Sequence, residues 1–192
     1  MTSHLVSKFT EEQYLAIERA ADVKSEFLHG EMVAMSGASL SHVRLQQNLS
    51  GELHAALRDC QCEVFGSNCR VKVPGRTYFY PDVCVVRGDP VMDDEHADNL
   101  LNPVVIFEVS SPSTARFDRD LKFQRYQSID SLNDYILVKQ ERVHIEHFTR
   151  QTDGKWRLRC YQGPDEELTI ESIGVAIPVS RIYARVNIPP TD

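Results

Sequence analysis

The feature that most constrains the fold is the run Val104-Val-Ile-Phe-Glu-Val109, which is apolar except for one glutamate. β-Branched and aromatic residues favour strands, and a strand that is apolar on both faces is typical of the middle of a covered sheet. The run therefore predicts a central buried strand that carries Glu108 near its end. An ionised carboxylate in such a place is strongly disfavoured unless a cation, hydrogen bonds or a proton compensates it.

A second carboxylate interrupts another apolar strand. Asp82 stands between Pro81 and the run Val83-Cys-Val-Val86, in a strand expected over residues 80–86. On adjacent strands, Asp82 and Glu108 would repel each other unless a cation lay between them. Hard oxygen ligands suit Mg²⁺, with Mn²⁺ as a substitute, rather than Zn²⁺. For either residue alone, the alternative is a turn cap or an arginine partner.

Three helices are expected around these strands. A capping box at Thr10 to Gln13 begins the first, with Tyr14, Ile17 and Ala21 on one face. A hairpin follows over residues 26–35, turning at His29-Gly30. The second helix, over about 41–58, carries a stripe that faces a sheet: Leu45, Leu49, Leu53 and Leu57. The third is expected over about 116–128.

Further strands are expected over residues 63–65, 70–73, 134–138, 143–149 and 156–161, with short ones to residue 179. No repeat or linker divides the 192 residues. The fold class expected is α/β (α+β, mixed sheet). We expect one domain over residues 1–192, with a central mixed sheet flanked by helices and followed by a C-terminal β-meander.

The third helix brings chemistry toward the central strand. Asp118, Lys122 and Tyr126 are four residues apart and share one helical face. Because this helix directly follows the central strand, Lys122 is expected close to Glu108. An ammonium group there could help to activate water and stabilise charge on a phosphoryl group. The alternative is a solvated lysine paired with Asp118.

Composition limits the choice of partners and compartment. The net charge of −7 and pI near 5.5 argue against a protein that holds nucleic acid with its whole surface, although a local basic groove stays open. No apolar window is long enough for a membrane span, and the N-terminus lacks a secretory layout, so we expect a cytoplasmic protein. Cys60 and Cys62, with Cys69 nearby, suggest zinc only weakly; thiols that fill space are expected instead.

Several short motifs occur in a fixed order: Glu26-Phe-Leu-His-Gly-Glu31, His42 at the start of a helix, Tyr-Pro-Asp82-Val, Phe-Glu108-Val-Ser-Ser-Pro-Ser-Thr, and Asp118-x3-Lys122-x3-Tyr126. As an ordered set, over about residues 10–150, they resemble the Uma-type family of predicted restriction endonucleases, a branch of the PD-(D/E)xK nuclease superfamily. The resemblance implies a restriction-endonuclease-like core and Mg²⁺-dependent cleavage of phosphodiester bonds.

The resemblance also implies roles for single residues. Asp82 and Glu108 are similar to the metal-binding carboxylates, and Val109 would lend its backbone carbonyl to the metal. The usual lysine position of the superfamily, two residues after the glutamate, is Ser110 here. The resemblance suggests that Lys122 on the following helix has taken over the role of that lysine.

Other site residues stay open. Glu31 and Glu26 are both candidates for an auxiliary acid, although Glu26 could instead pair with Lys24 or Lys72. His42 begins the leucine stripe and could be a general base, a phosphate contact or a hydrogen-bonded core histidine. Three arginines near the site could contact phosphates or be solvated: Arg116, Arg119 and Arg125.

Three functions compete. The first is a Mg²⁺-dependent DNA endonuclease; the second is a nucleic-acid-binding or regulatory module that keeps the nuclease fold without turnover. The third is a metal-dependent hydrolase of small phosphoesters, which no Gly-rich phosphate loop supports. Cleavage of both strands of a duplex makes a homodimer plausible, with the C-terminal meander as the interface.

Overall fold

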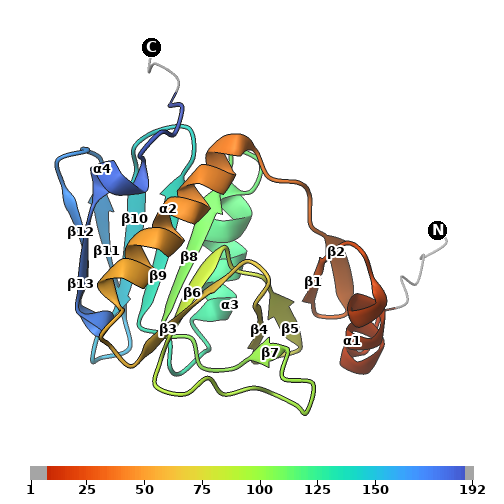
Figure 1. Ribbon diagram of the computed structural model, residues 1–192. Helices are drawn as coiled ribbons and strands as arrows, with labels where there is room; N and C mark the ends of the chain where they lie inside the picture. The colour runs from red at the N-terminus through yellow and green to blue at the C-terminus, as the bar shows by residue number, and fades with distance from the viewer. Residues whose placement is uncertain (1–7, 189–192) are drawn as a thin grey trace.

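The computed structural model describes residues 8–188, and a mixed six-stranded sheet forms its centre (Figure 1). β8 and β9 are parallel, and the other neighbouring pairs are antiparallel. β8 lies inside the sheet and is buried along its whole length, as the apolar run predicts. In spatial order the strands are β11 (Trp156–Tyr161), β10 (Ile145–Arg150), β9 (Asp134–Lys139), β8 (Val105–Ser110), β6 (Val83–Arg87) and β3 (Cys62–Gly66).

Helices cover both faces of this sheet. α2 (Leu40–Ala56) crosses one face, and the π-helical segment η1 (Phe117–Lys122) with α3 (Phe123–Tyr126) lies behind the other (Figure 1). The leucine stripe of α2 is buried, which confirms its prediction. Side chains of β8 alternate between the two cores, as strand geometry requires: Val105, Phe107 and Val109 enter the core under α2, and Ile106 enters the core shared with Tyr126.

A second, five-stranded sheet packs beside the first. Its order is β2 (Glu31–Ala34), β1 (Ser25–Leu28), β5 (Thr77–Phe79), β4 (Arg70–Val73) and β7 (Asn99–Leu100). The strand expected over residues 80–86 is therefore wrong in part, since β5 ends at Phe79 and β6 begins at Val83. Pro81 has no backbone N–H for a ladder, and here the chain leaves one sheet for the other. Asp82 lies in this crossing.

α1 (Glu11–Ala20) and the β1–β2 hairpin stand at one side of the molecule (Figure 1). The capping box at Thr10 is present, and Tyr14 stacks on Phe27 with ring centroids 4.7 Å apart. Of the three residues expected on one face of this helix, Tyr14 is buried, whereas Ile17 is 43% exposed and Ala21 is the exposed C-cap.

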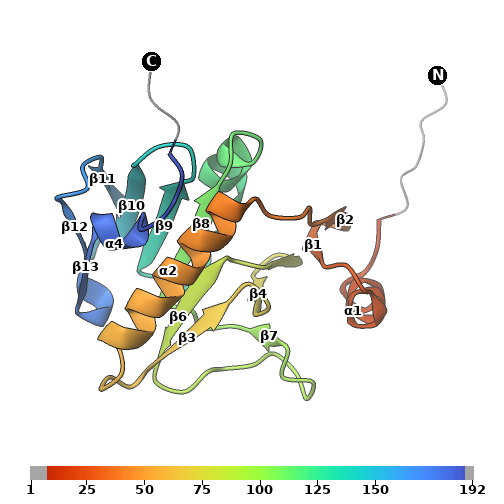
Figure 2. The ribbon, with the colours of Figure 1, turned by 45° about the horizontal axis from the view of Figure 1, so that its top comes forward.

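The C-terminal region has two parts (Figure 2). β9, β10 and β11 form the expected antiparallel meander, but they continue the central sheet. β12 (Glu167–Ile170) and β13 (Val175–Pro178) form a separate hairpin, joined by the 3₁₀ turn η2 (Glu171–Ile173) and followed by α4 (Val179–Ile182). This hairpin packs on the core under α2. Within residues 8–188 no helix has the length and apolar character that crossing a bilayer demands.

Candidate active site

Asp82 and Glu108 lie at the same end of two neighbouring strands of the central sheet. β6 and β8 are antiparallel and pair Val83 with Phe107, so Asp82, just before Val83, lies opposite Glu108, just after Phe107. The Asp82 carboxylate is tied on both oxygens. Oδ2 accepts a hydrogen bond from the Val109 backbone N–H at 2.7 Å, and Oδ1 lies 2.7 Å from His42 Nε2. The structure thus brings Asp82, Glu108, Val109 and His42 together.

Lys122 points into the same place. Its ammonium nitrogen lies 3.2 Å from Glu108 Oε1 and 2.7 Å from Glu26 Oε1, and all three side chains are buried. The Asp118 carboxylate lies 4.0 Å away, and Tyr126 donates a hydrogen bond to Glu108 Oε1 at 3.3 Å. The lysine is therefore not the solvated partner of Asp118 that one alternative supposed. It is the cation at the centre of a buried acidic cluster.

Carboxylates outnumber positively charged groups in this cluster. Burial raises the pKa of Glu108 well above its usual value; Lys122 opposes this rise, and the charges of Asp118, Asp82 and Glu26 add to it. Burial also disfavours the Lys122 ammonium, but its carboxylate neighbours outweigh burial, and the pKa of Lys122 is raised. Lys122 thus stays protonated at neutral pH. Because the carboxylates of the cluster outnumber its cations, a further positive charge would be stabilised there.

His42 forms the more open end of the cluster. The side chain is 20% exposed, against 7% for Lys122, so solvent reaches the cluster from the His42 side. Burial lowers the tendency of His42 to protonate, but the hydrogen bond and charge of Asp82 prevail, and the pKa of His42 is raised. Gln46 on the same helix donates to the Asp82 carbonyl at 3.0 Å. His42 therefore belongs to the cluster and is not a core histidine.

Ser110 occupies the strand position where the superfamily lysine is expected. It lies two residues after Glu108 on β8, so both side chains face the same side of the sheet. Its hydroxyl is fully buried and has no hydrogen-bond partner among residues 8–188. A polar atom left open beside Glu108 marks a place for a water molecule or a ligand atom.

The two glutamates of the β1–β2 hairpin, Glu26 and Glu31, lie in different surroundings. Glu26 on β1 lies in the cluster and also accepts a hydrogen bond from the Tyr80 backbone N–H at 3.3 Å. Its suggested partners are engaged elsewhere, since Lys24 binds Ser67 and Asn68, and Lys72 binds Asp93.

Glu31 is exposed on the edge strand β2 and makes no side-chain hydrogen bond or ion pair within the described part of the chain. The structure thus brings Glu26, not Glu31, into the cluster.

The arginines differ as well. Arg116 is almost fully exposed beside Asp120, and Arg119 pairs with Glu146 at 2.8 Å. Arg125 is half-buried, with a buried Nε that lacks a partner among the described residues. Of the three, Arg116 is the most available for a phosphate.

Sequence reasoning left two contributions unresolved. Glu26 shares a face of β1 with Leu28, which is only half-buried, while Phe27 on the other face is fully buried, so the alternation of this strand did not reveal the inward direction of Glu26. The π-helical turns of η1 had no sequence signal. They widen the helix at Asp118 and Lys122, and such segments often occur at functional sites.

The donor chemistry of the cluster suits a hard divalent cation. Asp82 and Glu108 offer carboxylate oxygens, and the Val109 carbonyl points to the same side as its N–H, toward Asp82. Among residues 8–188 no group of three His, Cys, Asp or Glu side chains is already placed to hold a metal.

The fold and the cluster together define a mixed α/β protein with an acidic site built around one lysine. The family model described as "Uma2: Putative restriction endonuclease" matches residues 11–180, and the chain belongs to this family.

Two relatives from Synechocystis sp. (strain PCC 6803) carry the names "Uncharacterized protein sll1609" and "Uncharacterized protein slr1290". The first is 38% identical over 160 residues, 83% of this chain and 90% of the relative. The second is 33% identical over 177 residues, 92% of each chain. Both matches span nearly the full length of the relatives.

A solved structure from Anabaena variabilis, described as "a putative nuclease belonging to DUF820", has the same fold. Its TM-score is 0.75, and the match covers 92% of this chain and 98% of that one, at 14% sequence identity.

Proposed function

We propose that the protein is a Mg²⁺-dependent endonuclease that hydrolyses phosphodiester bonds of DNA. The observation that carries the proposal is the Lys122 ammonium, held by Glu26 and Glu108 at 2.7 and 3.2 Å beside the Asp82–His42 pair. Membership in the Uma2 family supports the same activity. A site that joins carboxylates, a buried cation and a histidine contains the groups that phosphodiester hydrolysis requires.

A divalent cation would be held by Asp82, Glu108 and the Val109 carbonyl. When bound, Mg²⁺, or Mn²⁺ in its place, would polarise a phosphoryl oxygen and offset negative charge. It would also relieve the excess of carboxylates around Lys122. The Ser110 hydroxyl, which has no hydrogen-bond partner among the described residues, lies next to this place and could accept or donate a hydrogen bond there.

The chain's own residues would divide the remaining tasks. The carboxylates around Lys122 raise its pKa, so at neutral pH it would stabilise negative charge on the phosphoryl group and would not act as a base. His42 lies at the more open end, and Asp82 raises its pKa, so its ring would carry a proton to or from the site. Asp82 orients the His42 ring through Nε2, and Glu26 positions the lysine.

The partner would be DNA, bound locally and not across the whole acidic surface. Arg116, which is exposed at the start of the helix that carries Lys122, would meet a phosphate. A homodimer would place two such sites on the two strands of a duplex.

The test is nicking of supercoiled plasmid by purified protein with Mg²⁺ or Mn²⁺. Wild type should convert the plasmid to open circles, and EDTA should stop it. Asp82→Asn and Glu108→Gln should each lower the rate at least about 100-fold, because each removes a charged ligand while keeping the side-chain shape. Asp130→Asn, at an exposed position just beyond α3, is the matched control and should retain the rate.

A second candidate is a nuclease-fold protein that binds DNA without turnover. Ser110 at the superfamily lysine position and the engagement of Lys122 by carboxylates favour it. A gel shift of DNA without nicking under any divalent metal would replace the first function with this one. Nicking that survives Asp82→Asn would point to a contaminating nuclease and reject the proposed site.

A further inference from the structure

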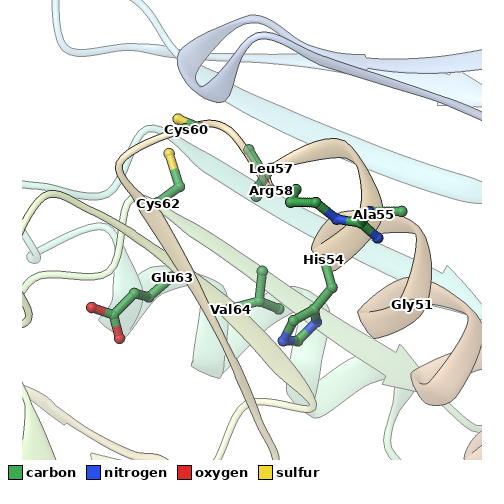
Figure 3. Close-up of a pocket in the computed structure, with 9 residues that line it drawn as sticks. All are labelled: Gly51, His54, Ala55, Leu57, Arg58, Cys60, Cys62, Glu63 and Val64. Carbon is green, nitrogen blue, oxygen red and sulfur yellow. The ribbon is translucent and has the colours of Figure 1, made fainter.

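A pair of cysteines lies at the opposite end of α2 from His42. Cys60 is exposed in the turn after α2, and Cys62 is half-buried at the start of β3. Both are free thiols that line an open pocket of about 610 Å³. Figure 3 shows their sulfur atoms side by side at the upper rim of this pocket. About 25 Å of helix separates them from the nuclease centre.

The Cys60 thiol affects the protonation of Cys62. Burial, followed by the hydrogen bond with Cys60, raises the pKa of Cys62 to about 11. A thiol with a raised pKa is a poor nucleophile, because the reactive form is the thiolate. A coordinating metal ion, in contrast, deprotonates a thiol outright. The raised pKa argues against covalent catalysis, and the case for coordination rests on the two neighbouring sulfur atoms (Figure 3).

The pocket offers the sulfurs no further ligands. His54 Nδ1 bonds the Ser50 carbonyl at 2.7 Å, which leaves Nε2 free, but the ring lies well below the sulfur atoms (Figure 3). The Glu63 carboxylate also points away from them (Figure 3). Within residues 8–188 no three His, Cys, Asp or Glu side chains are placed around one ion.

The third cysteine of the sequence cluster does not join them. Cys69 lies beyond the other end of β3, where it contacts the buried Cys84. The zinc site suggested by the spacing of Cys60, Cys62 and Cys69 is therefore not formed in the described structure.

The ligand number narrows the choice of ion. Thiolates select Cu(I), Zn²⁺ and iron–sulfur clusters among biological metals. Structural zinc takes four ligands, and iron–sulfur clusters take four as well. Two sulfurs alone match a soft monovalent ion that is content with two ligands.

We propose that Cys60 and Cys62 form a two-thiolate site for a soft d¹⁰ metal ion of the Cu(I) class. Binding replaces the two S–H bonds by two S–Cu bonds, and both protons pass to the buffer. Copper stays in the +1 state, so no oxidant or reductant takes part. This site is separate from the proposed nuclease centre and does not depend on that function.

The test is an anaerobic titration of the full chain with Cu(I) held by bicinchoninate. Wild type should withdraw one equivalent that Cys60→Ser and Cys62→Ser each bind at least about tenfold more weakly. Cys160→Ser is the matched control, since Cys160 is an exposed free thiol on β11. It should behave as wild type. Circular dichroism should show that all variants are folded.

A second readout locates the ion. Bound Cu(I) should protect Cys60 and Cys62, but not Cys160, from alkylation by iodoacetamide, as measured by peptide mass spectrometry. Unchanged Cu(I) binding by Cys62→Ser, loss of binding in Cys160→Ser, or no uptake by wild type would each overturn the proposal.

Discussion

Lys122 occupies a position that few lysines tolerate. It is 6% exposed, and its neighbours within 4.0 Å include three carboxylates: Glu26, Glu108 and Asp118. A buried charge is stable only when partners compensate its lost hydration, and here each side compensates the other. The lysine thus holds together β1, β8 and the helix that follows β8, in addition to any role in chemistry.

Removal of this cation should destabilise the fold. In Lys122→Met the carboxylates lose their partner at almost unchanged volume, so we expect the free energy of unfolding at pH 7 to fall by about 3–5 kcal/mol. Urea denaturation followed by fluorescence measures this. Lys155→Met is the control, because Lys155 is 82% exposed, and its change should stay within about 0.5 kcal/mol. Equal stability of both variants would contradict the buried-cation account.

A lysine moved to the strand should restore part of the function. In Ser110→Lys/Lys122→Met the new side chain starts on the same face of β8 as Glu108, at a position whose hydroxyl has no partner in the described structure. We expect it to recover at least about tenfold of the nicking rate lost in Lys122→Met. Ser111→Lys/Lys122→Met, one residue further along, points the lysine elsewhere and should recover nothing. Equal nicking rates in the two double variants would refute the claim that a lysine at position 110 can replace Lys122.

At the scale of elements, features that depend on neighbours in sequence were predicted correctly, whereas the pairing of strands distant in sequence was not. The leucine stripe of α2, the turn at Gly30 and the cap at Thr10 depend on neighbours in sequence, and the structure confirms them. The strand expected over residues 80–86 is divided at Pro81 because the two halves pair with different sheets. Pairing partners are set by tertiary packing, which periodicity within one segment does not encode.

The candidate site shows the same limit. Asp82, Glu108 and Lys122 could be predicted because charged residues interrupt apolar runs or share a helical face. The choice of Glu26 over Glu31 depends on which strand of the hairpin pairs with β5: β1, which carries Glu26, does so across about 50 residues, whereas Glu31 lies on the edge strand β2. The π-helical turns of η1 likewise depend on packing, which residue spacing alone does not reveal.

Asp98 anchors the N-terminal helix to the second sheet. It accepts hydrogen bonds from Arg19 of α1 at 2.8 Å and from Arg70 of β4 at 2.7 Å. The Arg19 bond is the main cause that lowers the pKa of Asp98 to about 2; burial opposes it, and the Arg70 charge adds to it. The unfolded chain has a pKa near 3.9, so this stabilisation is present above pH 4 and lost as the pH falls toward 2.

Asp98→Asn should therefore change the pH dependence of stability. We expect a loss of about 1–2 kcal/mol at pH 7, reduced from the full linkage value because the side chain is one-third exposed. Near pH 2 the variant and wild type should converge. Asp89→Asn, in an exposed loop, is the control and should follow wild type. Urea unfolding at pH 2, 4 and 7 gives the comparison; a constant difference across this range would be the contrary result.

The whole molecule is organised around one sheet with two cores. β6 and β8 contribute alternate side chains to the core under α2 and to the core under α3, so neither core can open without breaking the same strands. The small aromatic cluster of Tyr14, Phe27 and Tyr78 ties α1 to the second sheet. We therefore expect the three sheets to unfold together as one unit.

This arrangement predicts one cooperative unfolding transition. Differential scanning calorimetry should give a single peak whose calorimetric and van't Hoff enthalpies agree. Two separated peaks, or an early loss of the C-terminal hairpin seen by hydrogen exchange, would show that β12–β13 folds as an independent unit.

The central claim is that the cluster around Lys122 is a phosphodiesterase centre. The most direct measurement is the Mg²⁺-dependent nicking rate of supercoiled plasmid by wild type and by Lys122→Met, with Lys155→Met as the control. We expect Lys122→Met to lose at least about 100-fold in rate at a temperature where circular dichroism shows it folded, and Lys155→Met to match wild type. Nicking by Lys122→Met at the wild-type rate would contradict the account.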